Sequence, residues 1–155
     1  MTFNQKVAVF LATGGYIGYS PFAPGTMGSL VGIPLCFLLA QIQLAVAVIA
    51  VLLSIVLAVW ISNSAEKTLK RRDPGCIVID EIAGMLVTLI GVPLDPAAVI
   101  IGFSLFRILD ILKPFPIRIF DRRLSGGLGI VADDVVAGIF ANIFTRILLL
   151  IIGRY

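Results

Sequence analysis

Apolar stretches separated by short polar turns divide the whole chain. The stretch at residues 44–61 carries no charged side chain, and its length approaches the roughly 20 apolar residues that a helix needs to cross a bilayer. Four further apolar runs occupy residues 27–40, 82–92, 97–112 and 130–152. The pattern predicts an all-α fold, a polytopic membrane helical bundle with about five membrane-embedded helices, formed by residues 1–155 as a single domain.

Turn-forming residues mark the ends of these runs. Residues 41–43 separate the first two runs, and the Val-Pro-Leu-Asp-Pro sequence at 92–96 ends the third. Residues 113–116, Lys-Pro-Phe-Pro, end the fourth run, because proline cannot continue a helix without losing a hydrogen bond. The segment 1–16 has a short apolar stretch and no A-x-A cleavage site, so we expect it to remain in the mature protein.

The composition supports a membrane protein. The chain is 59% hydrophobic and 14% charged, whereas an ordinary soluble domain is roughly 45–50% apolar and about 25% charged. The net charge of +3 is too small to indicate nucleic-acid binding, and basic residues next to apolar runs are typical of contact with anionic lipid headgroups. The positions of the two cysteines do not indicate a disulfide framework, and the absence of histidine argues against a zinc site.

The basic residues predict which side of the membrane each loop faces. When five helices are threaded with the N-terminus in the cytoplasm, Lys6 and the basic residues of segments 67–72 and 113–123 lie inside, as the positive-inside rule requires. Only Arg146 and Arg154 lie outside, and we expect Arg146 to snorkel outward. The same threading places nearly every carboxylate at the cytoplasmic ends of the helices, so we expect an acidic site that faces the cytoplasm.

Two adjacent acidic pairs open apolar runs. Asp80 and Glu81 precede the third run, Asp133 and Asp134 precede the last, and Asp110 lies near the end of the fourth. Acids at helix N-termini can simply complement the helix dipole. Carboxylates gathered at one point would repel one another unless a divalent cation lay among them, and oxygen ligands suit magnesium or manganese. With five acids on one side of the membrane, metal binding is the favoured interpretation.

A glycine follows one acid of each pair at helical spacing. Gly84 comes four residues after Asp80, and Gly138 comes four residues after Asp134. Residues at this spacing lie on the same helix face, and small residues let membrane helices approach closely. We therefore expect the two acidic helix starts to pack against each other.

Several basic residues lie near the acids. Arg107 precedes Asp110 by three residues, which fits either a structural ion pair or an arginine that holds a phosphate oxygen. The segment 113–123 interleaves basic with apolar and aromatic residues and can lie in the membrane interface. For Arg122 and Arg123 in this segment, anchoring and substrate contact are equally consistent with the pattern.

Two backbone features could contact an anion. The glycines at 126, 127 and 129 precede the last helix, and glycine-rich turns before a helix expose N–H groups, although glycines also serve as hinges. Thr26 follows a rigid Pro-rich loop and is most simply a helix N-cap, with phosphate contact as the alternative. Neither cysteine has an arginine six residues on, so a metal-activated water or an aspartate nucleophile beside a metal remains.

Three sequence blocks resemble the phosphatidylglycerophosphatase A family. They are SPFAPGTMGSL at 20–30, DPGCIVIDEIAG at 73–84 and FRILDILKPFPIRIFDRRLSGGLGIVADDVVAG at 106–138. They cover a little over a third of the chain, in the family's order and with comparable spacing. The resemblance implies a magnesium-dependent phosphatase of the bacterial cytoplasmic (inner) membrane, which converts phosphatidylglycerophosphate to phosphatidylglycerol and phosphate in glycerophospholipid biosynthesis.

The resemblance also implies roles for individual residues. The metal ligands would be Asp80, Glu81, Asp110, Asp133 and Asp134. The catalytic residues would be Asp80, Glu81, Asp110 and Asp134. Together with the residue patterns above, it predicts substrate contacts from Arg107, Lys113, Arg118, Arg122, Gly126, Gly127 and Thr26. Asp73 and Asp121 would be neighbours of the site, and Glu66 and Asp95 ordinary solvated charges.

Two other classes of protein share some of these features. A transporter or ion pathway also uses intramembrane carboxylates, but it predicts acids through the depth of the membrane, whereas these gather at one end. A magnesium-dependent lipid-head transferase would need a second substrate and would release no phosphate. The sequence leaves open the number of metal ions and the oligomeric state.

Overall fold

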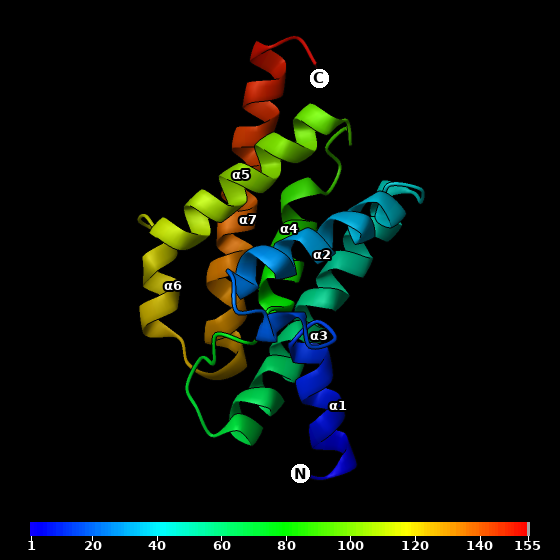
Figure 1. Ribbon diagram of the computed structural model, residues 1–155. Helices are drawn as coiled ribbons and strands as arrows, with labels where there is room; N and C mark the ends of the chain where they lie inside the picture. The colour runs from blue at the N-terminus through cyan, green and yellow to red at the C-terminus, as the bar shows by residue number, and fades with distance from the viewer. Residues whose placement is uncertain (155) are drawn as a thin grey trace.

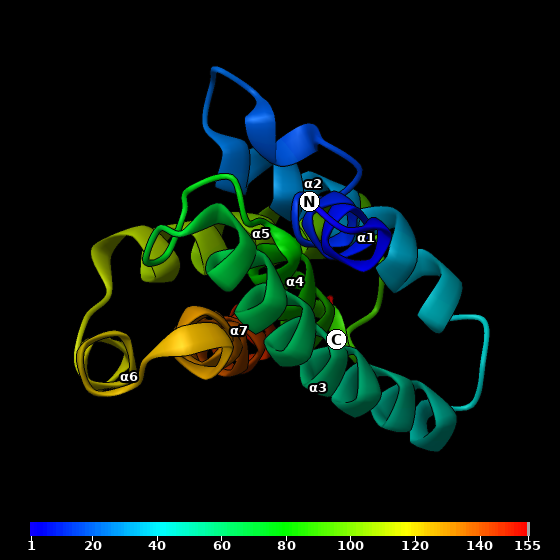
Figure 2. The ribbon, with the colours of Figure 1, turned by 90° about the horizontal axis from the view of Figure 1, so that it is seen from below.

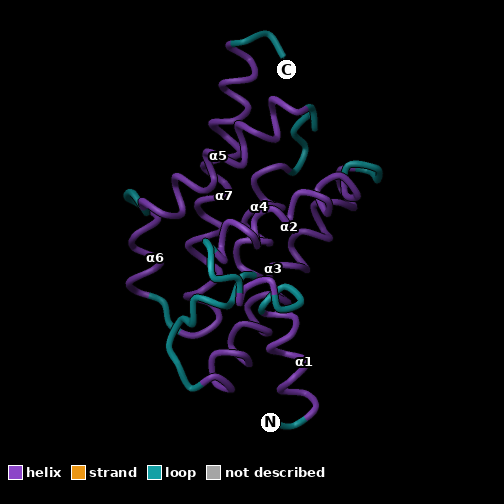
Figure 3. Tube along the Cα trace, viewed as in Figure 1, coloured by secondary structure: helices purple, strands orange, loops and turns teal. Residues whose placement is uncertain are grey.

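The protein is all-helical in a computed structural model that describes residues 1–154, without the side chains of residues 121 and 122. Most of this range is helical, with loops between the helices, and no strand occurs within it (Figures 1 and 3). The elements are α1 (Phe3–Ala12), the 3-10 helix η1 (Ile17–Tyr19), α2 (Pro24–Leu39), α3 (Leu44–Leu69), α4 (Ile79–Leu89), α5 (Pro96–Leu112), α6 (Ile117–Arg123) and α7 (Gly126–Ile151). The predicted all-α class is confirmed.

The short helix α4 forms the centre of the molecule. It packs against α2, α3, α5 and α7, and the view along the bundle shows it among them (Figure 2). Every residue from Ala83 to Leu89 is buried. With 11 residues, α4 is roughly 16 Å long, about half the thickness of a hydrocarbon core. The third apolar run is therefore apolar because protein surrounds it.

Two of the described helices, α3 and α7, are long and apolar enough to cross a membrane. Each has 26 residues, and α3 exposes large apolar side chains along its length, among them Leu52, Val56 and Trp60. The helices α2 and α5 have only 16 and 17 residues. Helix length therefore supports two spans and does not support the predicted number of about five, because hydropathy alone cannot separate burial in protein from exposure to lipid.

The last helix begins earlier than the sequence predicts. The glycines at 126–129 were expected to precede the helix, but α7 starts at Gly126. A Cβ atom on Gly127 would lie 2.0 Å from the carbonyl oxygen of Val59 on α3, so the absence of a side chain lets the first turn of α7 lie directly on α3. Asp133 and Asp134 consequently lie about two turns inside α7, too far from its N-terminus for the helix dipole to explain them.

Glycines hold α4 and α7 in close contact, as predicted. A Cβ on Gly138 would lie 2.6 Å from the carbonyl oxygen of Gly84, and a Cβ on Gly84 would lie 3.0 Å from the carbonyl oxygen of Asp134. The side chain of Phe106 fills the space beside Gly84 and is fully buried. This backbone contact brings the acidic pairs of the two helices together.

Polar side chains of α7 secure the other end of α4. The Nδ2 atom of Asn142 donates to the carbonyl oxygens of Val87, Thr88 and Ile90 at 3.2, 2.8 and 3.1 Å. Arg146 donates from Nη2 to the carbonyl oxygen of Ile90 at 2.9 Å. The guanidinium of Arg146 thus satisfies a carbonyl at the end of α4 that is opposite the acidic pairs, and its expected outward orientation in a membrane stays a prediction.

Candidate active site

A pocket of about 490 Å³ opens where the start of α4, the end of α5 and the first turns of α7 meet. Seven of the nine acidic residues of the chain line it, together with two basic residues and the glycine-rich start of α7. The acidic residues are Glu66, Asp73, Asp80, Glu81, Asp110, Asp133 and Asp134. We call this cavity the acidic pocket.

The N-terminal third of the chain positions the acids of α4. The backbone N–H of Val78, which precedes α4, donates to the carbonyl oxygen of Ala12 at 2.8 Å. Asp80 and Glu81 then occupy the first turn of α4, where the helix dipole favours negative charge. A Cβ on Gly25 would lie 2.1 Å from Oε1 of Glu81, so the glycine at the start of α2 leaves room for that carboxylate.

The structure brings together all five predicted metal ligands. Asp80, Glu81 and Asp134 each offer a carboxylate oxygen, and these atoms lie within 4.8 Å of one another. Asp110, Asp133 and Asp134 form a second such group. The two groups share Asp134, which therefore lies at the centre of the acidic pocket.

Several oxygens of the first group have no partner. Asp80 and Asp134 are only 8% and 3% exposed. Oδ1 of Asp80, Oε2 of Glu81 and Oδ2 of Asp134 are buried and accept no hydrogen bond from the described residues. A buried carboxylate without a partner costs several kcal/mol. An all-oxygen donor set of this kind fits a hard divalent cation such as Mg²⁺.

The two carboxyl groups at the start of α4 have raised pKa values. Burial, followed by the charges of Glu81 and Asp134, raises the pKa of Asp80 well above its usual range. Burial likewise raises the pKa of Glu81, although a hydrogen bond with Asp80 acts in the opposite direction. Protons and a metal ion would therefore compete for the same oxygens.

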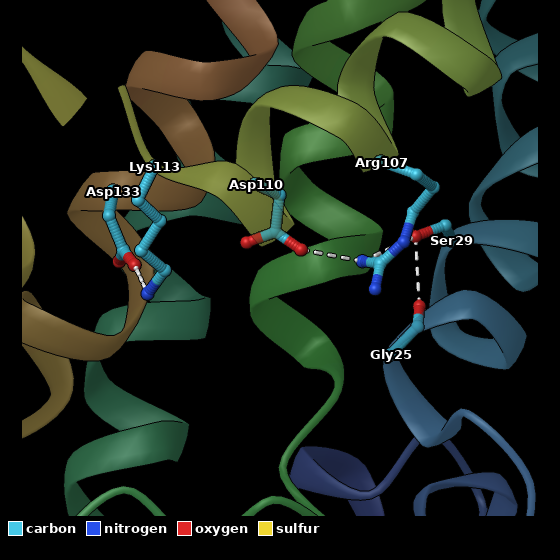
Figure 4. A network of polar contacts seen from close by, with 6 residues as sticks. All are labelled: Gly25, Ser29, Arg107, Asp110, Lys113 and Asp133. Carbon is cyan, nitrogen blue, oxygen red and sulfur yellow. Dashed lines mark hydrogen bonds and ion pairs between the residues drawn. The ribbon is translucent and has the colours of Figure 1, made fainter. Parts of the chain in front are cut away.

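Two members of the second group, Asp110 and Asp133, are paired with cations (Figure 4). Nη1 of Arg107 lies 2.7 Å from Oδ2 of Asp110 and also donates to Oγ of Ser29 at 3.3 Å. Lys113 at the end of α5 pairs with Oδ2 of Asp133. Of the two interpretations of Arg107, the ion pair is present. Arg107 is not among the residues that line the acidic pocket, so it braces Asp110 from behind.

Some of the other predicted substrate contacts line the acidic pocket, and others lie elsewhere. Lys113 and Gly126 line the acidic pocket. Gly127 faces α3 instead, as described above. Thr26 lies inside the first turn of α2, whose N-cap is Ala23, so the interpretation of Thr26 as the N-cap is wrong.

The remaining two contacts were expected from α6. Arg118 is exposed on this helix and lines a different pocket. The side chain of Arg122 lies outside the described residues.

Sequence reasoning missed Glu66. It is half-buried, lines the acidic pocket and accepts a hydrogen bond from the backbone N–H of Asp73 at 3.1 Å, so its interpretation as an ordinary solvated charge is wrong. The residues that follow the apolar run have good helix propensity, and α3 does continue to Leu69. This propensity could have predicted that Glu66 lies on the helix and not in a loop. Asp95, by contrast, is not among the residues that line the acidic pocket, and it caps α5 by accepting from the N–H of Ala98 at 2.7 Å.

Known proteins are similar in sequence to this chain over most of its length. The family model for phosphatidylglycerophosphatase A matches residues 10–149. Phosphatidylglycerophosphatase A of Escherichia coli K12 is 44% identical over 132 residues, which cover 84% of this chain and 77% of the relative. The protein of the same name from Haemophilus influenzae is 40% identical over 135 residues, with coverage of 86% and 83%.

A third relative has a different name. A putative phosphatidylinositol-3-phosphatase of Bacteroides thetaiotaomicron is 37% identical over 153 residues, which cover 94% of this chain and 95% of the relative. No solved structure matches the chain. The family model and the two relatives named for it cover the helices that build the acidic pocket, and the chain therefore belongs to the phosphatidylglycerophosphatase A family of phosphatases.

Proposed function

We propose that this protein hydrolyses the terminal phosphate monoester of phosphatidylglycerophosphate and releases phosphatidylglycerol and phosphate, with Mg²⁺ as its cofactor. The observation that carries the proposal is the group of three convergent carboxylates, each with a buried oxygen that has no hydrogen-bond partner, in a pocket large enough for a phosphate. Family membership supplies the substrate class, because the relatives are named for this activity.

The carboxylates divide into two roles in this proposal. Asp80, Glu81 and Asp134 hold the ion, since one carboxylate oxygen of each converges with the others and each residue also has a buried oxygen without a hydrogen-bond partner. A divalent cation bound there would polarise the phosphate and lower the pKa of the attacking water. Asp110, which Arg107 holds in place, serves as a further ligand or as the general base.

As the general base, Asp110 would carry a proton from the attacking water to the leaving group. Asp110 takes a proton as the water oxygen bonds to phosphorus, and the bond from phosphorus to the glycerol oxygen breaks. The proton then passes to the departing glycerol oxygen, which leaves as the free hydroxyl of phosphatidylglycerol. Lys113 lines the pocket, and its ammonium offsets charge that develops on the phosphoryl oxygens.

We further propose that the protein is a multi-pass protein of the bacterial cytoplasmic membrane. The long helices α3 and α7 would cross the bilayer, and α2, α4 and α5 would be embedded beside them. The basic residues of the α3–α4 loop and of α6 would lie on the cytoplasmic side, and with them the acidic pocket. In this arrangement the lipid keeps its acyl chains in the bilayer while its headgroup enters the pocket.

Phosphate release from phosphatidylglycerophosphate in detergent micelles tests the proposed activity. We expect release with Mg²⁺, one phosphatidylglycerol formed per phosphate, and loss of release with excess chelator. Phosphatidylinositol 3-phosphate belongs in the same assay because one relative is named for that lipid. Absence of release from phosphatidylglycerophosphate in Mg²⁺ would contradict the proposal, and release without phosphatidylglycerol would indicate another substrate bond.

A further inference from the structure

A second pocket, of about 350 Å³, lies at the corner where α5 leads into α6. Lys113 lines both this corner pocket and the acidic pocket. Arg118 and Arg123 also line the corner pocket, and none of the described residues that line it is a carboxylate. Lys113 therefore lies between the acidic pocket and a pocket whose described charged lining residues are all basic.

Apolar side chains border the corner pocket. Leu112 and Phe115 line it and are 72% and 82% exposed, and Ile119 lines it from α6. Large exposed apolar side chains beside arginines are typical of a membrane interface, where hydrocarbon and headgroup meet. A molecule in this pocket would have its anionic group at the cations and its hydrocarbon over Leu112 and Phe115.

We propose that the corner pocket binds the phosphate diester of the lipid substrate while the terminal phosphate monoester occupies the acidic pocket. This inference rests on the proposed function. Phosphatidylglycerophosphate carries two phosphates joined by one glycerol, and the diester is the phosphate nearer to the acyl chains. The substrate therefore needs a cationic site beside the catalytic pocket and next to hydrocarbon, and the corner pocket has both neighbours.

Each cation has a place in this arrangement. Lys113 lies between the two phosphates because it lines both pockets, and its ammonium pairs with Asp133 of the acidic pocket. The guanidinium groups of Arg118 and Arg123 bind the diester oxygens, for which the planar fork of arginine is suited. The acyl chains leave across Leu112 and Phe115 into the bilayer. The corner pocket thus selects lipids that have a phosphate diester one glycerol away from the reacting phosphate.

Kinetics in micelles of a neutral detergent test the inference. The double variant Arg118→Gln/Arg123→Gln removes two exposed cations, and Arg118→Lys/Arg123→Lys keeps their charge. Arg71→Gln removes an exposed cation that lines neither pocket and serves as the matched control. For each protein we would measure kcat and KM for phosphatidylglycerophosphate and the inhibition constant of inorganic phosphate, which binds where the monoester binds.

The inference predicts a selective change in KM. In the double glutamine variant, KM rises roughly tenfold or more, the scale of losing charged hydrogen bonds, while the inhibition constant of phosphate stays constant. The lysine variant shows a smaller rise in KM, and Arg71→Gln shows none. An unchanged KM in the glutamine variant, or an equal rise in the inhibition constant of phosphate, would overturn the inference. An inactive parent protein would instead remove the proposed function on which it rests.

Discussion

Replacing Gly138 by alanine tests the backbone contact that joins α4 to α7. The added Cβ would lie 2.6 Å from the carbonyl oxygen of Gly84 and 3.1 Å from Cβ of Val87. The nearer of these atoms belongs to the backbone of a helix that is packed on several sides, so it cannot move aside cheaply. We expect the two helices to separate by some tenths of an ångström.

The magnitude follows from two opposing effects. Overpacking a well-packed contact costs about 1–3 kcal/mol, and a clash with backbone belongs in the upper half of that range. Alanine in a helix interior is more favourable than glycine by about 0.5–1 kcal/mol. The net loss in the free energy of unfolding is then about 1–2.5 kcal/mol, which for a chain of this length lowers Tm by roughly 2–10 °C.

Thermal unfolding in detergent, followed by circular dichroism, measures this change. Gly75→Ala is the matched control, because a Cβ on Gly75 has nothing within 4 Å, and its Tm should stay that of the parent. Gly138→Ala should also require more Mg²⁺ for half-maximal activity, since separating α4 from α7 moves the carboxylates of Asp80 and Asp134 apart. A Tm for Gly138→Ala equal to or above that of the parent would refute the packing argument.

Three further substitutions probe the site and its support. Asp80→Asn should lower phosphate release by roughly a hundredfold or more, the scale of losing one group that acts on the transition state, with Tm unchanged; near-normal turnover would remove Asp80 from the metal site. Arg107→Gln should lower kcat roughly tenfold or more with little change in KM, because Arg107 positions Asp110, whereas a rise in KM alone would indicate direct substrate contact. Asn142→Leu should cost about 2–4 kcal/mol of unfolding free energy, because the carbonyl oxygens of Val87 and Thr88 lose the donor that the amide supplies; an unchanged Tm would contradict this role of Asn142.

The convergence of the acids was predictable from local sequence patterns. The spacing of Gly84 after Asp80 and of Gly138 after Asp134 depends only on helical periodicity, and the glycines do lie at the contact between the two helices. The end of α5 before Pro114 was predictable for a similar reason, because the constraint on proline acts on neighbouring residues.

Features that depend on tertiary contacts were not predictable in this way. The start of α7 at Gly126 depends on the fit of Gly127 against the backbone of α3, which no local pattern encodes. Arg146 contacts the carbonyl of Ile90, a residue far away in the sequence. Helix length supports only two spans, and the sequence alone could not show this because a helix buried in protein, such as α4, has the same hydropathy as one buried in lipid.

Calorimetric titration of Mg²⁺ into the detergent-solubilised protein tests the central claim most directly. The parent and Asp134→Asn would be compared. Asp134 belongs to both groups of convergent carboxylates. Its replacement by asparagine should therefore weaken Mg²⁺ binding whichever group holds the ion. The structure predicts saturable binding to the parent and its loss in Asp134→Asn, with Tm of the metal-free proteins unchanged or higher in the variant. Equal binding by the two proteins, or an active parent that binds no Mg²⁺, would contradict the assignment of the metal to this pocket.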